Sequence, residues 1–253
     1  FMKEETKVNT KGVILAGGLG TRLHPLTTVI SKQLLPIYNK PMIFYPLSVL
    51  VDAGINDIMI ITTKEHEENF KKLLGYGEDW HVNLTYKIQE KPEGIAQSLI
   101  LSESWSKDSQ VVLILGDNLF FGPNLNNIVR DGINNNSGAT IFCIESDNPE
   151  RFGVIEFDKK FKAISIKEKP KKPKTKWVVT GLYIYNNQAP KYAKSLKKSN
   201  RGEYEITDLN NLYLLNNKLN VKKLEGDFSW LDTGTFDSLL EASNYVKELE
   251  NKK

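Results

Sequence analysis

The sequence predicts an α/β protein with a Rossmann-like, mostly parallel mixed sheet flanked by helices, and with a small antiparallel extension in its second half. In the first half, short β-branched runs alternate with helical patterns, which is typical of βαβ units. The run VVLIL at 111–115 is apolar throughout, which indicates a strand buried on both faces. In the second half, several strands follow one another with little helix between them, which favours antiparallel pairing.

The predicted elements follow one another in a definite order. The first half is expected to contain strand 12–16, helix 42–53, strand 57–63, helix 65–74, strand 82–89, helix 95–105 and strand 110–117. The second half is expected to contain strands 139–146, 152–157, 163–169 and 178–185, helices 188–196 and 206–215, strand 220–226, the segment 229–235 and helix 236–249. Neither a repeat nor a linker divides these elements, so residues 11–249 are expected to form one domain.

A polar segment precedes this domain. Residues 1–10 lack the apolar stretch of a signal peptide, and Phe1 before Met2 indicates a remnant of cloning. No apolar run approaches the roughly 18 residues that a membrane-spanning helix needs. The single cysteine, Cys143, lies in the apolar run ATIFCI, which predicts a buried thiol and fits a reducing compartment. We therefore expect a cytoplasmic protein.

The charge balance restricts the partners. The 253 residues include 34 basic and 31 acidic side chains, a net charge of +3, and 40% of the residues are hydrophobic. So small an excess argues against bulk electrostatic binding to nucleic acid or to a membrane. The lysine-rich segment 167–176 is predicted to be a solvated loop with functional residues only at its start. A nucleic-acid binder using this loop is a competing interpretation, but Trp177 is its only adjacent aromatic residue.

The stretch GVILAGGLGTRLHPLTTVISKQLLP, residues 12–36, places a glycine-rich loop after the first strand. It lacks the Gly-Lys pair of a P-loop, and Leu23 stands at the third glycine of a dinucleotide fingerprint. Glycines let backbone N–H groups approach an anion, and the planar guanidinium of Arg22 suits phosphate oxygens. From the pattern alone, both a phosphate-binding loop and a simple tight turn remain open.

The longer pattern LAGGLGTRLHPLT…SKQLLPIYNKPMI closely resembles the signature of sugar-1-phosphate nucleotidyltransferases. The motifs KQLLP, LGDN, RFGV, EKP, VTGLY, RGEYEITDLN and WLDTGT are similar to those of the glucose-1-phosphate thymidylyltransferases within that family. These motifs occur in the family's order and extend from Leu15 to Thr235. The resemblance implies that residues 11–145 bind mainly the nucleotide and residues 146–235 mainly the sugar.

The resemblance also implies a reaction. dTTP and α-D-glucose 1-phosphate would give dTDP-glucose and pyrophosphate, through in-line attack of the sugar phosphate on the nucleotide α-phosphorus, assisted by Mg²⁺. Both reactants are anions, so the enzyme must cancel their repulsion and hold the line of attack. The phosphate monoester is already ionised, so the reaction needs no protein nucleophile.

Matched positions give the candidate site residues. The resemblance implies catalytic functions for Arg22, Lys32, Asp117 and Lys169. It implies nucleotide contacts for Leu15, Gly17, Gly20, Thr21, Arg22, Lys32, Gln33, Gln89, Gly94, Asp117 and Asn118. It implies sugar phosphate contacts for Gly153, Glu168, Lys169, Val179 and Arg201, and metal binding by Asp117 and Asp232.

The residue types suit these functions. The amide of Gln89 can donate and accept at once, as the edge of thymine requires. Asp117 ends a predicted buried strand, where a carboxylate needs a compensating cation such as Mg²⁺. Other interpretations compete with these functions: Asp117 as a helix cap, and Lys32, Glu168 and Lys169 as ordinary surface charges.

Two departures from the family pattern bear on function. Phe152 stands where many relatives have Tyr, which removes a polar group near the sugar and weakens the prediction of sugar identity. The chain ends at Lys253, whereas larger relatives continue into a segment that helps form a regulatory site, so feedback control and the associated tetramer are less expected. A homo-oligomer, either a dimer or a tetramer, is still expected.

Alternative functions follow from the same motifs. A uridylyl-, cytidylyl- or guanylyltransferase, or an enzyme for another hexose or aminohexose 1-phosphate, would use the same chemistry. UTP is a candidate second substrate because one methyl group is worth only ~1–3 kcal/mol of discrimination. A non-catalytic, sugar-nucleotide-binding regulatory protein is a further alternative, but such a protein would be expected to have lost Arg22, Lys32, Asp117 or Asp232, and this chain keeps all four.

Overall fold

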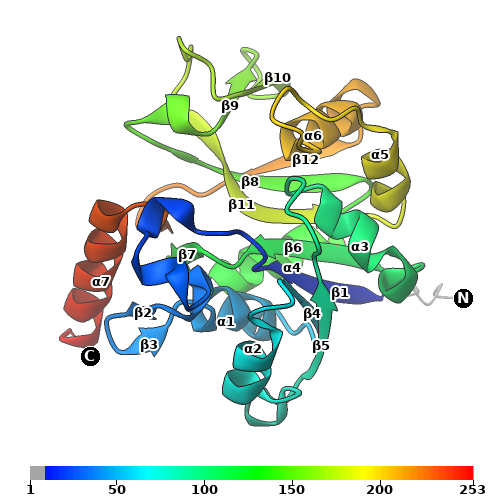
Figure 1. Ribbon diagram of the computed structural model, residues 1–253. Helices are drawn as coiled ribbons and strands as arrows, with labels where there is room; N and C mark the ends of the chain where they lie inside the picture. The colour runs from blue at the N-terminus through cyan, green and yellow to red at the C-terminus, as the bar shows by residue number, and fades with distance from the viewer. Residues whose placement is uncertain (1–8, 253) are drawn as a thin grey trace, which may run out of the picture.

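The computed structural model describes residues 9–252, in which a central mixed sheet carries helices on both of its faces (Figure 1). The predicted polar tail and the Phe1 remnant lie mainly outside the described residues. Within residues 9–252, no helix combines the length and the apolar character that crossing a bilayer requires.

The elements have the following bounds. The strands are β1 Thr10–Leu15, β2 Pro36–Ile37, β3 Lys40–Pro41, β4 Asp57–Thr62, β5 Asn83–Ile88, β6 Gln110–Leu115, β7 Asn118–Phe121, β8 Ala139–Glu145, β9 Gly153–Phe157, β10 Ala163–Glu168, β11 Trp177–Tyr185, β12 Leu219–Lys223 and β13 Ser229–Asp232. The α-helices are α1 Phe44–Asp52, α2 Glu67–Leu74, α3 Gln97–Ser106, α4 Leu125–Asn134, α5 Ala189–Ser195, α6 Ile206–Leu215 and α7 Phe236–Glu250.

The main sheet has nine strands and a parallel centre. Its principal order is β10-β9-β11-β6-β1-β4-β5, and β1, β4, β5 and β6 run parallel to one another. Strand β11 pairs antiparallel with β6, β8 and β9, while β12 pairs parallel with β8. The mixed sheet with an antiparallel extension in its second half is therefore confirmed.

Successive residues of the central strands face opposite sides of the sheet, as the two-residue period of a strand requires. Ile14 of β1 joins the hydrophobic cluster formed with α1, α2 and α4, whereas Val13 joins the cluster formed with α3, α5 and α6. Both side chains are completely buried. The apolar runs of the parallel strands thus reflect helices packed on both faces (Figure 1).

A third hydrophobic cluster joins α7 to the segment that follows β1. Ala242 of α7 packs in this cluster together with Leu23. The side chain of Thr235 caps the start of α7 within a capping box. Strand β13 immediately precedes this helix and pairs antiparallel with β7, which places Asp232 opposite Asn118. The cluster therefore fixes the segment that carries Asp232.

The sequence patterns do not predict α4, β7 or the β2–β3 hairpin. The α4 sequence LNNIVRDGIN contains three asparagines and a glycine, which are weak helix formers. Tertiary packing stabilises this helix instead: Val129 is completely buried, and the missing side chain of Gly132 leaves room for Ile184. Strand β7 has only four residues and acquires its partner, β13, from a distant part of the chain.

Cys143 provides a test of the packed core. Its side chain is fully buried in β8, and burial raises the pKa of its thiol to about 12. Because the thiolate is the reactive form, we expect native protein not to react with an aromatic disulfide reagent at neutral pH. One thiol per chain should react after unfolding in guanidinium chloride. Prompt modification of the native protein would contradict this arrangement of the core.

Candidate active site

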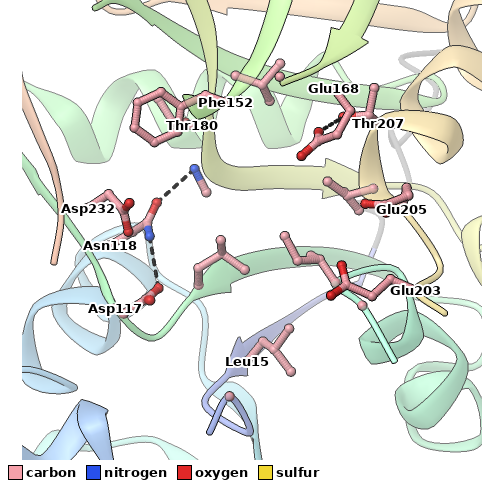
Figure 2. A pocket seen from close by; sticks show the side chains of 18 of the residues that line it. Leu15, Asp117, Asn118, Phe152, Glu168, Thr180, Glu203, Glu205, Thr207 and Asp232 are labelled. Carbon is pink, nitrogen blue, oxygen red and sulfur yellow. Dashed lines mark hydrogen bonds between the residues drawn. The ribbon is translucent and has the colours of Figure 1, made fainter. Parts of the chain in front are cut away.

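A cleft of about 650 Å³ lies where the parallel strands meet the antiparallel extension. Leu15 and Leu115 end adjacent parallel strands in register, and both line the cleft. Figure 2 shows side chains from both parts of the sheet pointing into this space. The residues assigned from the sequence that line it are Leu15, Arg22, Gln33, Gln89, Gly94, Asp117, Asn118, Gly153, Glu168, Lys169, Val179, Arg201 and Asp232.

Four assigned residues, Gly17, Gly20, Thr21 and Lys32, are not among the residues that line the cleft. Gly17 packs against a glutamine side chain that does line the cleft. Gly20 has a left-handed φ of 60° and precedes the short 3-10 turn that begins at Thr21. Lys32 is buried, and its ammonium reaches the cleft only through Asp117. The glycine loop thus contributes shape through its backbone, as its sequence suggests.

Arg22 brings a positive charge from the glycine loop into the cleft. Its guanidinium lies against the backbone at Gly234, where a Cβ atom would stand 2.7 Å from Nη2. The ion pairs found among residues 9–252 do not include Arg22. Its planar donor fork is therefore available to an anion, and phosphate oxygens match that fork.

Two carboxylates from distant parts of the chain converge in the cleft. Asp117 follows β6, and Asp232 ends β13 beside β7. The Thr233 hydroxyl donates a hydrogen bond to the backbone oxygen of Asp117 at 2.9 Å, which ties the two segments together. Figure 2 shows both carboxyl groups close to the amide of Asn118.

The Asp117 carboxylate is compensated on both of its oxygens. Lys32 Nζ lies 2.5 Å from Oδ2, and Asn118 Nδ2 donates to Oδ1 at 3.0 Å. Burial alone would raise the pKa of Asp117, but the charge of Lys32 and the hydrogen bonds from Lys32 and Asn118 outweigh it and lower that pKa. Asp117 therefore remains ionised at neutral pH.

Asp232 has the opposite balance. Burial and the neighbouring charge of Asp117 raise the pKa of Asp232, and the charges of Lys32, Arg22 and Arg151 offset this only in part. The ion pair that Asp232 makes within residues 9–252 joins its Oδ2 to Arg151 Nη2 at 3.7 Å. The two carboxylates together thus need more positive charge than the surrounding side chains supply.

Asn118 connects three strands around the carboxylates. Its Oδ1 accepts hydrogen bonds from Gly181 N of β11 at 3.1 Å and from Trp230 Nε1 of β13 at 2.7 Å. A Cβ atom on Gly181 would collide with this amide, so the close approach requires glycine. Because Nδ2 also holds Asp117, Asn118 positions the carboxylate and has one N–H left for a ligand.

The sugar-side strands place a carboxylate and a lysine at one end of the cleft. Glu168 ends β10 opposite Gly153 of β9, and it accepts a 2.6 Å hydrogen bond from Thr207 Oγ1. Lys169 follows directly, with Nζ 3.5 Å from Glu168 Oε1. Phe152 lines the neighbouring wall and packs edge-to-face on Trp230, with ring centroids 4.8 Å apart.

Arg201 lines the same end, but carboxylates already surround it. Its Nη2 lies 2.8 Å from Glu205 Oε2, 3.3 Å from Glu203 and 3.8 Å from Glu168. The sequence motif predicts a contact with the sugar phosphate for Arg201. The structure leaves Lys169 as the less encumbered cation at this end, because Lys169 has one long ion pair.

The wall of the cleft that carries Gln89 and Gly94 presents neutral groups, next to Glu203. Gln89 is 3% exposed, and its Nε2 donates to Gln97 Oε1 at 2.5 Å. Gly94 has a positive φ of 99°, and a Cβ atom there would stand 2.5 Å from the backbone oxygen of Tyr204. Glycine at this position therefore lets the segment before α6 close against the segment before α3.

The cleft contains further residues that the sequence analysis does not assign. They are Gly18, Pro92, Ile95, Leu115, Arg151, Thr180, Gly181, Tyr183, Glu203, Glu205, Ile206, Thr207 and Trp230. Many of them stand within the quoted motifs RFGV, VTGLY, RGEYEITDLN and WLDTGT. Treating each motif as a continuous wall of the site would have found them.

The donor set suits a magnesium ion. Mg²⁺ commonly takes one or two carboxylates and completes its shell with substrate phosphates and water. Asp117 and Asp232 supply two carboxylates whose mutual repulsion a divalent cation would relieve. Within residues 9–252, no group of three or more His, Cys, Asp or Glu side chains could hold a metal by protein ligands alone. The residues therefore fit an ion that binds together with phosphates.

Comparisons with known proteins agree with this geometry. The sequence profile of the family described as Nucleotidyl transferase matches residues 11–248. A glucose-1-phosphate thymidylyltransferase from Neisseria meningitidis is 51% identical over 241 residues, which cover 95% of this chain and 84% of that protein. One from Mycobacterium tuberculosis is 48% identical over 242 residues, covering 96% of this chain and 84% of that protein.

Solved structures extend the comparison. A Bacillus anthracis protein assigned as a glucose-1-phosphate thymidylyltransferase, crystallised with sucrose, is 44% identical and superposes with a TM-score of 0.87. That match covers 93% of this chain and 94% of that one. A UDP-glucose pyrophosphorylase bound to UDP-glucose superposes with a TM-score of 0.80 at 21% identity over 94% of this chain and 98% of its own, which shows a shared fold.

The fold and the cleft define a nucleotidyltransferase. The chain belongs to the nucleotidyl transferase family and, within it, to the glucose-1-phosphate thymidylyltransferases. Members of such a family join a nucleotide to a sugar phosphate, which matches a cleft lined by neutral amide and backbone groups together with several cations.

Trp230→Phe tests the hydrogen bonds around Asn118. The substitution removes the indole N–H that donates a hydrogen bond to Asn118 Oδ1, and it keeps an aromatic ring against Phe152. We expect a loss of about 0.5–1.5 kcal/mol in the free energy of unfolding. We also expect slower turnover, because Asn118 positions Asp117. Thermal unfolding and a pyrophosphate-release assay measure the two effects. Trp177→Phe, outside the cleft, is the matched control and should leave turnover unchanged.

Proposed function

We propose that this protein transfers the thymidylyl group of dTTP to α-D-glucose 1-phosphate and releases pyrophosphate. The observation that carries this proposal is the convergence of Asp117, Asp232, Arg22 and Lys32 at one edge of the parallel sheet. The names of the most similar relatives support the choice of both substrates. The 11–145 part of the domain would hold mainly the nucleotide, and the 146–235 part mainly the sugar.

Mg²⁺ held by Asp117 and Asp232 would neutralise phosphate charge and make the α-phosphorus easier to attack. The protein residues would provide the rest of the electrostatic stabilisation. Arg22 would bind the departing pyrophosphate, and the lack of an ion pair to its guanidinium within the described chain supports this. Lys32 adds a second positive charge behind Asp117. Charge stabilisation of this kind is worth several kcal/mol when the charges are fixed in advance.

The sugar phosphate would approach from the side of β9, β10 and β11. Lys169 would bind its phosphate, with Arg201 adding positive charge at the same end. Glu168, already oriented by Thr207, would accept hydrogen bonds from sugar hydroxyls, next to the backbone of Gly153 and Val179. Holding the nucleophile in place would convert an encounter of two repelling anions into a reaction within one complex.

The base would bind at the wall that carries Gln89 and Gly94. The amide of Gln89 can both donate to and accept from the Watson–Crick edge of thymine, and Gly94 leaves the backbone accessible. The glycine loop from Leu15 through Gly17, Gly20 and Thr21 would follow the ribose and phosphates, with Gln33 and Asn118 beside them.

The wider setting follows from this reaction. We propose Mg²⁺ as the cofactor, a cytoplasmic location, and assembly as a dimer or tetramer. The product would supply deoxysugar synthesis and, through it, polysaccharide synthesis. The neutral thiol of Cys143 is compatible with a reducing cytoplasm.

Single charge deletions test the mechanism. We expect Asp117→Asn and Arg22→Ala each to reduce the rate of pyrophosphate release at least ~10²-fold, as for the loss of one charge-stabilising group. Asp131→Asn is the matched control because Asp131 pairs with Lys222 on the surface, and it should retain full activity. Normal turnover by either folded variant would remove that residue from the mechanism.

A substrate panel tests the specificity. We expect dTTP to react more efficiently than UTP by about 10–200-fold in kcat/KM, the range that one methyl group supplies in a fitted pocket. CTP and GTP should give little product, and glucose 1-phosphate should be preferred over other hexose 1-phosphates.

Other outcomes of this panel identify the alternatives. A preference for UTP, CTP or GTP would make the protein a different nucleotidyltransferase. A preference for another hexose or aminohexose 1-phosphate would reassign the sugar. Binding without turnover for every pair would indicate a regulatory protein that uses the same fold.

A further inference from the structure

Each of the two carboxylates in the cleft has its own cationic partner. Lys32 Nζ lies 2.5 Å from Asp117 Oδ2, and Arg151 Nη2 lies 3.7 Å from Asp232 Oδ2. Arg22, a third cation in the cleft, has no carboxylate partner among residues 9–252. Two cations, Arg151 in the cleft and the buried Lys32 beside it, are therefore engaged by the same two side chains that would hold a divalent ion.

Arg151 is held in the cleft by an aromatic contact as well as by its ion pair. Its guanidinium lies 5.4 Å from the ring of Phe152, and Phe152 packs in turn on Trp230. Stacking on an aromatic face constrains a guanidinium to a plane but lets it slide along that plane. The side chain is 40% exposed, and its contact with Asp232 is long, so this ion pair is easily exchanged.

Lys32 is held differently. Its side chain is only 6% exposed, and its one ion pair is with Asp117. A buried ammonium that loses its carboxylate needs another anion nearby, because an unpaired buried charge is costly. A phosphate group bound in the cleft would be such an anion.

We propose that the cleft works by cation exchange: a divalent ion taking Asp117 and Asp232 displaces Lys32 and Arg151, and both cations then bind substrate phosphates. This inference rests on the proposed metal site. It assigns to Arg151, which the sequence motifs do not single out, a function as a phosphate-binding residue. It also makes metal binding and phosphate binding mutually dependent. The metal takes the carboxylates that the cations leave, and the phosphates take the cations that the metal displaces.

Binding of Mn²⁺ alone tests the first half of the exchange. Free Mn²⁺ is measured by electron paramagnetic resonance during titration of the protein, without nucleotide or pyrophosphate. Lys32→Met and Arg151→Met each remove a competitor, so each should bind Mn²⁺ at least ~10-fold more tightly than the unaltered protein. Lys169→Met is the matched control: it removes a cation of the same cleft whose ion pair in the described chain is with Glu168, and it should change the affinity much less.

The outcomes separate this inference from the proposed function. If Mn²⁺ binds and all three variants change its affinity equally, a general field effect accounts for the data, and the exchange is overturned. If Asp117→Asn binds Mn²⁺ as well as the unaltered protein does, the metal site itself is wrong. Arg151→Met keeps the test usable should Lys32→Met fail to fold, because Arg151 is partly exposed.

Binding of inorganic pyrophosphate in the presence of a chelator tests the second half. Asp232→Asn releases Arg151, so calorimetry should show pyrophosphate binding several-fold more tightly to this variant. The gain should disappear when Arg151→Met is combined with Asp232→Asn. If the gain persists in the double variant, it comes only from relief of repulsion by Asp232, and Arg151 is not a phosphate-binding residue.

Discussion

The repulsion between Asp117 and Asp232 is the constraint that organises the cleft. The pKa of Asp232 is raised by burial and by the charge of Asp117, so holding both groups together is unfavourable without added positive charge. The backbone pairing of β13 with β7 and the capping box of α7 hold Asp232 in its position near Asp117. The surrounding fold thus holds the two carboxylates together despite their repulsion, and a divalent cation can supply the positive charge that they lack.

Sequence patterns predict the parallel centre of the fold because its signals are local. Each residue of the run at 111–115 is apolar, so burial on both faces is evident without knowledge of the partners. Helix α4 lacks such a signal, because Gly132 and the asparagines oppose helix formation. The presence of a glycine at position 132 becomes clear only from the close packing of Ile184 against it. Strand β7 depends on a partner more than 100 residues away, which no local window contains.

The same distinction applies to the site. Motifs locate Asp117, Lys32 and Glu168 because each stands in a recognisable segment. They do not show that Lys32 contacts Asp117. Nor do they show that Asn118 makes hydrogen bonds to Asp117, Gly181 and Trp230 at once. Those contacts depend on strand register across the sheet. Arg151 went unassigned for a similar reason: its significance comes from its distance to Asp232, and the sequence alone does not contain that distance.

The distribution of charge in the cleft is consistent with the proposed binding of base, phosphates and sugar in different parts of it. The wall with Gln89 and the backbone near Gly94 offers neutral donors and acceptors, which suit a neutral base. Charges of both signs surround Asp117 and Asp232, where phosphates and a metal would bind under the proposed mechanism. At the sugar end, Arg201 compensates three carboxylates, so these can accept hydroxyl hydrogen bonds without repelling an anionic substrate strongly. Under the proposed function, discrimination between sugars would depend on how the hydrogen bond from Thr207 orients Glu168.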